Sequence, residues 1–101
     1  MINFDPAQGR ELNARHPAVV ISLDSIGALP LRIVVPITSH FGKDWLIELL
    51  PNATNGLTKV CSADAFQCKS ISNDRFLFRM GAASESELED ILDAVAMCIG
   101  I

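Results

Sequence analysis

Polar side chains able to transfer protons or to hold an anion gather in two stretches of this 101-residue chain. The first stretch runs from Asp5 to Pro17 and includes Arg15 and His16, and the second is Thr38-Ser39-His40. Histidine changes its charge near neutral pH, arginine neutralises anions, and hydroxyl groups donate hydrogen bonds to developing negative charge. These residue types therefore fit acid–base chemistry on an anionic substrate, although each stretch taken alone also fits an ordinary surface loop.

Other common functional motifs are missing from the sequence. It contains no GxGxxG or Walker loop for nucleotides, no HExxH zinc motif and no GxSxG nucleophile motif. The three cysteines, Cys61, Cys68 and Cys98, lack the short paired spacings of a zinc site or a disulfide framework. We therefore expect reduced, packed cysteines and no bound metal or cofactor.

Length and composition predict one globular domain over residues 1–101. Half of the residues are hydrophobic and a fifth are charged, which excludes an intrinsically disordered chain. No apolar run reaches the roughly 18 residues that a membrane span requires, so no membrane association is expected. The first residues show neither the basic nor the apolar region of a secretory signal, so we expect a cytoplasmic protein.

The negative charge is confined to the end of the chain. Five acidic and no basic side chains follow Met80, whereas residues 1–80 carry eight basic and seven acidic ones. Nothing in this distribution resembles the basic stripe of a dedicated nucleic-acid binder. The part before Met80, with a net charge of +1, can still accept an anionic ligand.

Short β-strands are predicted over residues 1–80, because β-branched and aromatic runs alternate with Pro, Gly and Asn breakers. The predicted strands cover residues 18–21, 31–35, 45–50, 59–61, 65–71 and 75–79. Many short strands separated by turns indicate a small barrel or a strongly bent sheet. Trp45 and Phe66 are expected in its core, although their rings could instead stack on nucleic-acid bases.

A helix is predicted at the end of the chain. Ser84 and Glu87 form the Ser-x-x-Glu pattern of a capping box. One apolar face is predicted by side chains that recur at helical spacing, namely Leu88, Ile91, Leu92, Val95 and Ile99. The acidic side chains fall in the first turns, where the helix dipole favours negative charge, and we expect them to form a solvated face.

Four motifs, in this order and spacing, resemble the PemK/MazF family of toxin endoribonucleases. They are Phe4-Asp5-Pro6-x-x-Gly9-x-Glu11, Pro17–Ser22, Val35-Pro36-Ile37-Thr38-Ser39 and Ser62–Ile71, and Arg75, Gly81 and the terminal helix complete the pattern. The resemblance covers nearly the whole chain. It implies a mainly β fold with a C-terminal α-helix, a small SH3-like barrel, assembled as a homodimer.

The same resemblance implies an activity and partners. Members of the family cut single-stranded RNA without a metal and leave a 2′,3′-cyclic phosphate and a 5′-hydroxyl. They are the toxins of type II toxin–antitoxin systems, and each is neutralised by a cognate antitoxin protein whose disordered tail lies across the active face.

In the family, an arginine directly before the motif proline and the threonine of Pro-Ile-Thr-Ser carry most of the chemistry. Thr38 matches the second position, where its hydroxyl would hold a non-bridging phosphate oxygen. The first position departs from the pattern, because His16 precedes Pro17 and Arg15 lies one residue further back. Arg15 could reach the phosphate while His16 serves as base or acid. Alternatively the site is weakened, because neighbouring residues of an extended chain point to opposite sides.

Arg15, His16 and Thr38 are therefore predicted as the catalytic set. The predicted substrate-binding residues are Arg10, Glu11, Ser39, Gln67 and Lys69, of which Gln67 and Lys69 lie on the strand that lines the RNA face in relatives. Asp64, close to them in the sequence, is either structural or catalytic.

Two other functions remain open on the sequence alone. A gyrase-poisoning toxin of the CcdB type has the same barrel but acts through protein–protein contact by a terminal Trp-Gly-Ile. This chain has Ile99-Gly100-Ile101 at its end, and the absence of the tryptophan argues against that target. The other alternative is a degenerate homologue that kept the fold and lost the activity, which the change at His16 would favour.

Overall fold

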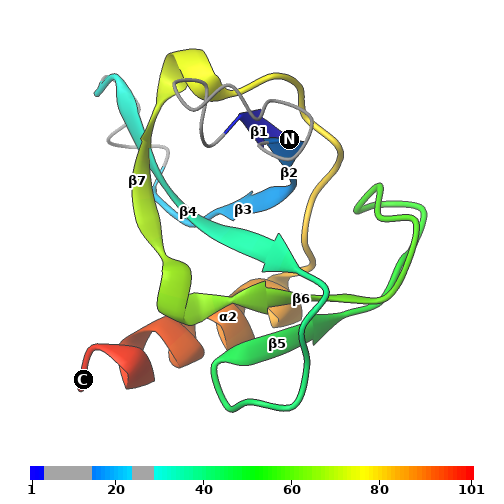
Figure 1. Cartoon of the computed structure of the whole chain (residues 1–101), viewed down its shortest axis with the longest axis vertical. Helices are drawn as coiled ribbons and strands as arrows, with labels where there is room; N and C mark the ends of the chain where they lie inside the picture. The colour runs from blue at the N-terminus through cyan, green and yellow to red at the C-terminus, as the bar shows by residue number, and fades with distance from the viewer. Residues whose placement is uncertain (4–14, 24–28) are drawn as a thin grey trace.

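The computed structural model describes residues 1–3, 15–23 and 29–101, and these residues are mainly β with one α-helix near the C-terminus (Figure 1). Their strands are β1 (Ile2–Asn3), β2 (Arg15–His16), β3 (Ala18–Val20), β4 (Leu31–Thr38), β5 (Leu46–Leu49), β6 (Cys61–Asp64) and β7 (Lys69–Ser72). Two short 3-10 helices, η3 (Ala65–Gln67) and η4 (Asn73–Arg75), flank β7, and α2 (Glu85–Cys98) follows. The predicted fold class, mainly β with a C-terminal helix, is confirmed.

The sheet is organised around β4. One edge of β4 pairs antiparallel with β3, with Val19 opposite Val35. The other edge is shared, because β7 pairs with the first half of β4 and β6 pairs with its last two residues, Ile37 and Thr38. β5 then pairs with β6. Among the described strands the order β3-β4-β6-β5 is open and β7 branches from β4, so the expected barrel takes the form of a bent, unclosed sheet.

Pro36 sits where the partner of β4 changes from β7 to β6. Odd-numbered residues of β4 hydrogen bond to the residues that flank β3: the Ile37 N–H donates to the Pro17 carbonyl at 3.0 Å, and the Ile33 carbonyl accepts from the Ile21 N–H at 2.9 Å. Because backbone groups alternate between the two edges of a strand, the backbone nitrogen of Pro36 faces the other edge, where η3 interrupts the ladder. A proline is tolerated there because no partner strand needs its missing N–H.

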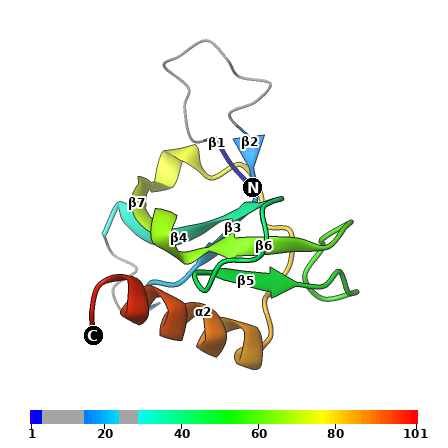
Figure 2. The same ribbon diagram turned by 60° about the horizontal axis from the view of Figure 1, so that its bottom comes forward.

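Two apolar clusters cover opposite faces of the sheet. The larger one joins the sheet to α2 and contains Val35, Leu49, Cys61, Ala63 and Ile91, all buried. The smaller one lies on the other face, where Ile2, Val34 and Ile71 are buried against Ala18 and Phe76. Figure 2 shows α2 beneath β5 and β6, with β1 and β2 at the far end of the molecule. The alternating side chains of β4 thus serve both clusters, odd residues toward the helix and even residues away from it.

The capping box predicted for α2 is confirmed. The Ser84 hydroxyl accepts a hydrogen bond from the Glu87 N–H at 3.0 Å, and the Glu87 carboxylate accepts one from the Ser84 N–H at 2.8 Å. These two bonds satisfy backbone donors that would otherwise lack partners at the helix start. Ile91 is buried as expected, whereas Leu92 keeps 42% of its surface exposed, so the apolar face of α2 is wider than the sheet covers.

Two predicted strands are wrong. Residues 65–71 begin as η3, because the Asp64 carboxylate accepts the Phe66 N–H at 3.2 Å and starts a turn before β7. Phe66 is consequently 64% exposed, not in the core, and it contacts the half-buried Trp45 with ring centroids 5.8 Å apart. Residues 75–79 form no strand and only one bridge, between Phe76 and Ile2. The strand predicted at 59–61 starts only at Cys61.

Candidate active site

The pairing of β3 with β4 ends one residue short of His16 and Thr38. Ala18 lies opposite Pro36, and the next pair is closed by the hydrogen bond from the Ile37 N–H to the Pro17 carbonyl. Extended one residue beyond this pair, the register would set His16 opposite Thr38, although β2 itself pairs with β1. Directly opposed residues of an antiparallel pair share one face and have Cβ atoms about 4.5–5.5 Å apart. At that spacing the His16 imidazole and the Thr38 hydroxyl could both contact the same group of a bound substrate.

Arg15 has a different orientation from His16. β2 pairs with β1, with Asn3 opposite Arg15 and Ile2 opposite His16. Successive side chains of a strand point to opposite faces, so Arg15 alternates away from the face that His16 shares with Thr38. Both side chains are exposed. The opposite orientation of Arg15 and His16 is the arrangement on which the second alternative drawn from the sequence, a weakened site, is based.

Thr38 ends β4 and begins a turn whose residues are exposed. Its Oγ1 accepts a hydrogen bond from the His40 N–H at 3.3 Å, which fixes the first step of the turn. The turn closes where the Leu46 N–H donates to the Lys43 carbonyl at 3.0 Å. Ser39 follows Thr38 directly and is exposed, so the structure keeps the predicted Thr38 and Ser39 together at one strand end.

Two residues to which the sequence analysis gave no role share this face. Ser62 of β6 lies opposite Thr38, and Glu48 of β5 lies opposite Ser62. Thr38, Ser62 and Glu48 form a polar row across β4, β6 and β5, and the extended β3–β4 register would add His16 to its end. The row has no signature in the sequence, because its members are up to 46 positions apart (His16 to Ser62) and only the strand register aligns them.

The other predicted substrate-binding residues are more scattered. Gln67 lies in η3 and Lys69 opens β7, both exposed, and Lys69 lies opposite Val34 on the same edge of β4 that pairs with Ser62. Asp64 has a structural role, because its carboxylate caps η3. Arg10 and Glu11 lie outside the described residues.

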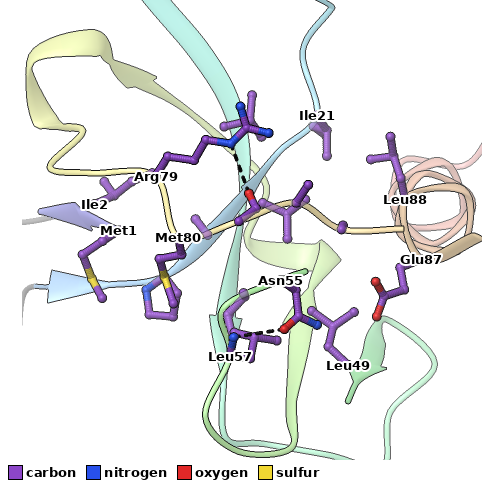
Figure 3. Close-up of a pocket in the computed structure, with 18 of the residues that line it drawn as sticks. Met1, Ile2, Ile21, Leu49, Asn55, Leu57, Arg79, Met80, Glu87 and Leu88 are labelled. Atoms are coloured by element: carbon purple, nitrogen blue, oxygen red, sulfur yellow. Dashed lines mark hydrogen bonds between the residues drawn. The ribbon is translucent and has the colours of Figure 1, made fainter. Parts of the chain in front are cut away.

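A cavity lies outside this polar row, and no member of the row lines it. It has a volume of about 760 Å³ and opens between β3, the segment 76–83 and the start of α2 (Figure 3). Its labelled polar groups are already hydrogen bonded: the Asn55 carbonyl oxygen accepts the Leu57 N–H at 3.0 Å, and the Arg79 Nε donates to the Gly81 carbonyl at 3.4 Å. The lining is mostly apolar, so we place the chemistry at the row that contains His16 and Thr38.

Comparison with known proteins decides the family. Residues 1–99 match the family described as the PemK-like, MazF-like toxin of type II toxin–antitoxin systems. The chain belongs to this family. It is also 37% identical over 103 aligned positions to endoribonuclease MazF9 of Mycobacterium tuberculosis, covering 95% of this chain and 87% of that protein.

Solved structures agree with the fold of this MazF-like toxin. MazF of Deinococcus radiodurans superposes with a TM-score of 0.76 and 26% identity, over 99% of this chain and 90% of that one. A MazE-MazF structure from the same organism gives a TM-score of 0.72 at 24% identity, over 86% and 84% of the two chains, and this likeness supports the fold alone.

The cysteines of this MazF-like toxin are not members of the polar row. Among the described residues Cys61, Cys68 and Cys98 are free thiols, and Cys61 is buried in the cluster beneath α2. Burial raises the pKa of the Cys61 thiol, an effect that nearby Lys59 opposes and Glu87 reinforces. Burial also raises the pKa of Cys68, with a smaller contribution from Cys98. Raised pKa values keep both thiols protonated and unreactive, as packed structural cysteines should be.

Proposed function

We propose that this chain is a metal-independent endoribonuclease, the toxin of a type II toxin–antitoxin pair, and that it cleaves single-stranded RNA at the polar row. The observation that carries this proposal is the β3–β4 register up to the Pro17–Ile37 hydrogen bond, directly beyond which His16 and Thr38 follow, in a chain of the MazF-like family. The similarity to a protein named an endoribonuclease supports the reaction class.

The reaction we assign to the site is an in-line displacement at phosphorus. The RNA 2′-hydroxyl loses its proton to the His16 imidazole, its oxygen bonds to the adjacent phosphorus, and the bond to the 5′-oxygen breaks. The 5′-oxygen takes up a proton, from the imidazolium or from water, and leaves as a 5′-hydroxyl. The products are a 2′,3′-cyclic phosphate and a 5′-hydroxyl, so protons and bonds balance without a metal or a cofactor.

Thr38 supplies the hydrogen bond that this reaction needs at the phosphate. A hydroxyl aimed at a non-bridging oxygen stabilises the charge that builds up as the phosphorus becomes five-coordinate. Lys69, exposed on the neighbouring β7, adds positive charge for the RNA backbone, and Arg15, on the opposite face of β2, contacts RNA beyond the reacting phosphate. Ser39 and Gln67 complete the substrate contacts assigned to described residues.

Two protein partners belong to the same proposal. A second copy of the chain would cover apolar side chains that β3, β4 and their flanks leave exposed, namely Val20, Leu23, Leu29, Leu31 and Ile33. A cognate antitoxin is expected from the family, and MazF of Deinococcus radiodurans is known with MazE. We place the protein in the cytoplasm, where single-stranded mRNA is available. No helix among the described residues is long and apolar enough to cross a membrane.

The deciding experiment is cleavage of a long single-stranded RNA by the purified chain in EDTA, with analysis of the new ends. We expect cleavage with 2′,3′-cyclic phosphate and 5′-hydroxyl ends, and its loss in His16→Ala and Thr38→Ala. If a folded chain leaves the RNA intact at high enzyme excess, the proposed activity is wrong. Cleavage that requires a divalent metal would refute the mechanism while leaving the substrate class in place.

A further inference from the structure

Ser62 has a buried hydroxyl without a partner. The residue is only 1% exposed, and its Oγ is the one side-chain polar atom that the described residues bury without any hydrogen bond. Buried hydroxyl groups are hydrogen bonded in the great majority of native structures, and an unpaired one costs free energy. We therefore expect the Ser62 hydroxyl to have a hydrogen-bond partner nearby on the same face of the sheet.

The register gives this hydroxyl two side-chain neighbours. Ser62 lies between Thr38 of β4 on one side and Glu48 of β5 on the other, each directly opposite it. Cross-strand neighbours of this kind are close enough for Thr–Ser hydrogen bonds. Thr38 is half-buried beside Ser62, whereas Glu48 is exposed to solvent, which can satisfy its carboxylate. The structure forms no Ser62–Thr38 hydrogen bond, so a rotation of the Ser62 side chain is needed to make one, and Thr38 is the less exposed of the two candidates.

We propose that Ser62 is a positioning residue for RNA cleavage, whose hydroxyl donates a hydrogen bond to Thr38 Oγ1. A hydroxyl group has one proton to donate and two lone pairs that accept. The His40 N–H already occupies one lone pair of Thr38 Oγ1 at 3.3 Å, and the Ser62 hydroxyl would occupy the other. The only direction left for the Thr38 proton is outward, toward the scissile phosphate. Ser62 thereby turns a freely rotating hydroxyl into an oriented donor.

This proposal rests on the proposed function, and the first experiment tests them together. In Ser62→Ala, single-turnover cleavage at saturating RNA should slow by about tenfold while KM changes less than twofold, since one neutral hydrogen bond corresponds to roughly a two- to twelvefold effect. In a Thr38→Val background the same substitution should change the cleavage rate less than twofold, because the hydroxyl that Ser62 orients is gone. A purely structural Ser62 would leave the rate unchanged, and an equal loss in both backgrounds would place Ser62 outside the Thr38 contact.

A second readout needs no RNA. Urea unfolding of wild type, Ser62→Ala, Thr38→Val and the double variant gives the coupling between the two hydroxyls, expected at about fivefold in the unfolding equilibrium constant. A parallel cycle with Glu48→Gln should give no coupling. Absence of coupling to Thr38, or coupling to Glu48 in its place, would overturn the proposal. Because this cycle measures the coupling between the two hydroxyls without RNA, it tests the hydrogen bond even if wild type fails to cleave RNA. That failure would refute only the proposed function.

Discussion

Replacing Thr38 by valine should remove the activity while leaving the fold intact. Valine keeps the β-branched shape that suits the last position of β4, and it deletes only the hydroxyl. If this hydroxyl is the donor that stabilises the developing charge on the phosphate, the cleavage rate should fall by about 10²–10³-fold, the range measured for a single lost donor of this type. That loss corresponds to roughly 2.7–4 kcal/mol of transition-state stabilisation.

The expected cost in stability is much smaller. The hydrogen bond that the structure gives to Thr38 Oγ1 comes from the His40 N–H at 3.3 Å, at the exposed end of the strand. Water can replace this acceptor once it is removed, and loss of the proposed bond from Ser62 adds a similar cost, so the free energy of unfolding should fall by about 2 kcal/mol or less. A domain of this size then loses no more than about 8–16 °C in Tm.

The assay is single-turnover cleavage of a labelled RNA by wild type, Thr38→Val and Thr38→Ser, with thermal unfolding of the same three samples. Thr38→Ser is the matched control, because it keeps the hydroxyl and loses one methyl group, and we expect it to retain at least a tenth of the rate. A valine variant that cleaves within threefold of wild type would refute the assignment. So would a serine variant as slow as the valine variant.

The remaining predictions concern the rest of the row, the helix and the buried thiol. His16→Ala should slow cleavage by about 10²-fold or more, as loss of a general acid or base does. Arg15 lies on the opposite face of β2, so Arg15→Ala should slow cleavage less than tenfold. The reverse order in cleavage assays would mean that Arg15 is the catalytic group. Ser84→Ala breaks the capping box and should lower the free energy of unfolding by about 1 kcal/mol in urea titrations, without changing the cleavage rate, because α2 packs on the face away from Thr38. Burial raises the pKa of Cys61 above its ordinary value of 9.0, so the folded chain holds the thiol proton more tightly than the unfolded chain. The stability that this proton provides is fully present below pH 9.0 and is lost as the pH rises through the folded-state pKa. A Cys61→Ser variant should accordingly show a smaller decline in unfolding free energy between pH 8 and pH 10 than wild type, and an identical decline would contradict the effect of burial.

Sequence reasoning works best here where structure is local. The capping pair Ser84 and Glu87 lies within one helical turn, and the interactions that start α2 need nothing from the rest of the chain. The strands next to prolines were also predictable, because Pro17 and Pro51 flank β3 and β5 closely. The stretch 65–71 was not, because a single Asp64 side chain caps a turn inside an apolar run and so overrides the strand propensity of the residues that follow.

The site was only partly predictable, because it is a property of strand register. The resemblance to a family points to Thr38 and to the residue before Pro17 through local motifs, yet Ser62 and Glu48 enter the row only because β6 and β5 align with Thr38. The same register bears on the departure from the family pattern. On the extended β3–β4 register, a side chain directly before Pro17 would face Thr38 whatever its type, whereas Arg15 alternates to the other face. We therefore expect the position to matter more than the charge that the family places there. Histidine in that position brings a group that exchanges protons near neutral pH, which an arginine cannot do. In the proposed site, histidine in place of arginine would therefore change the chemistry beside Thr38 without moving the site.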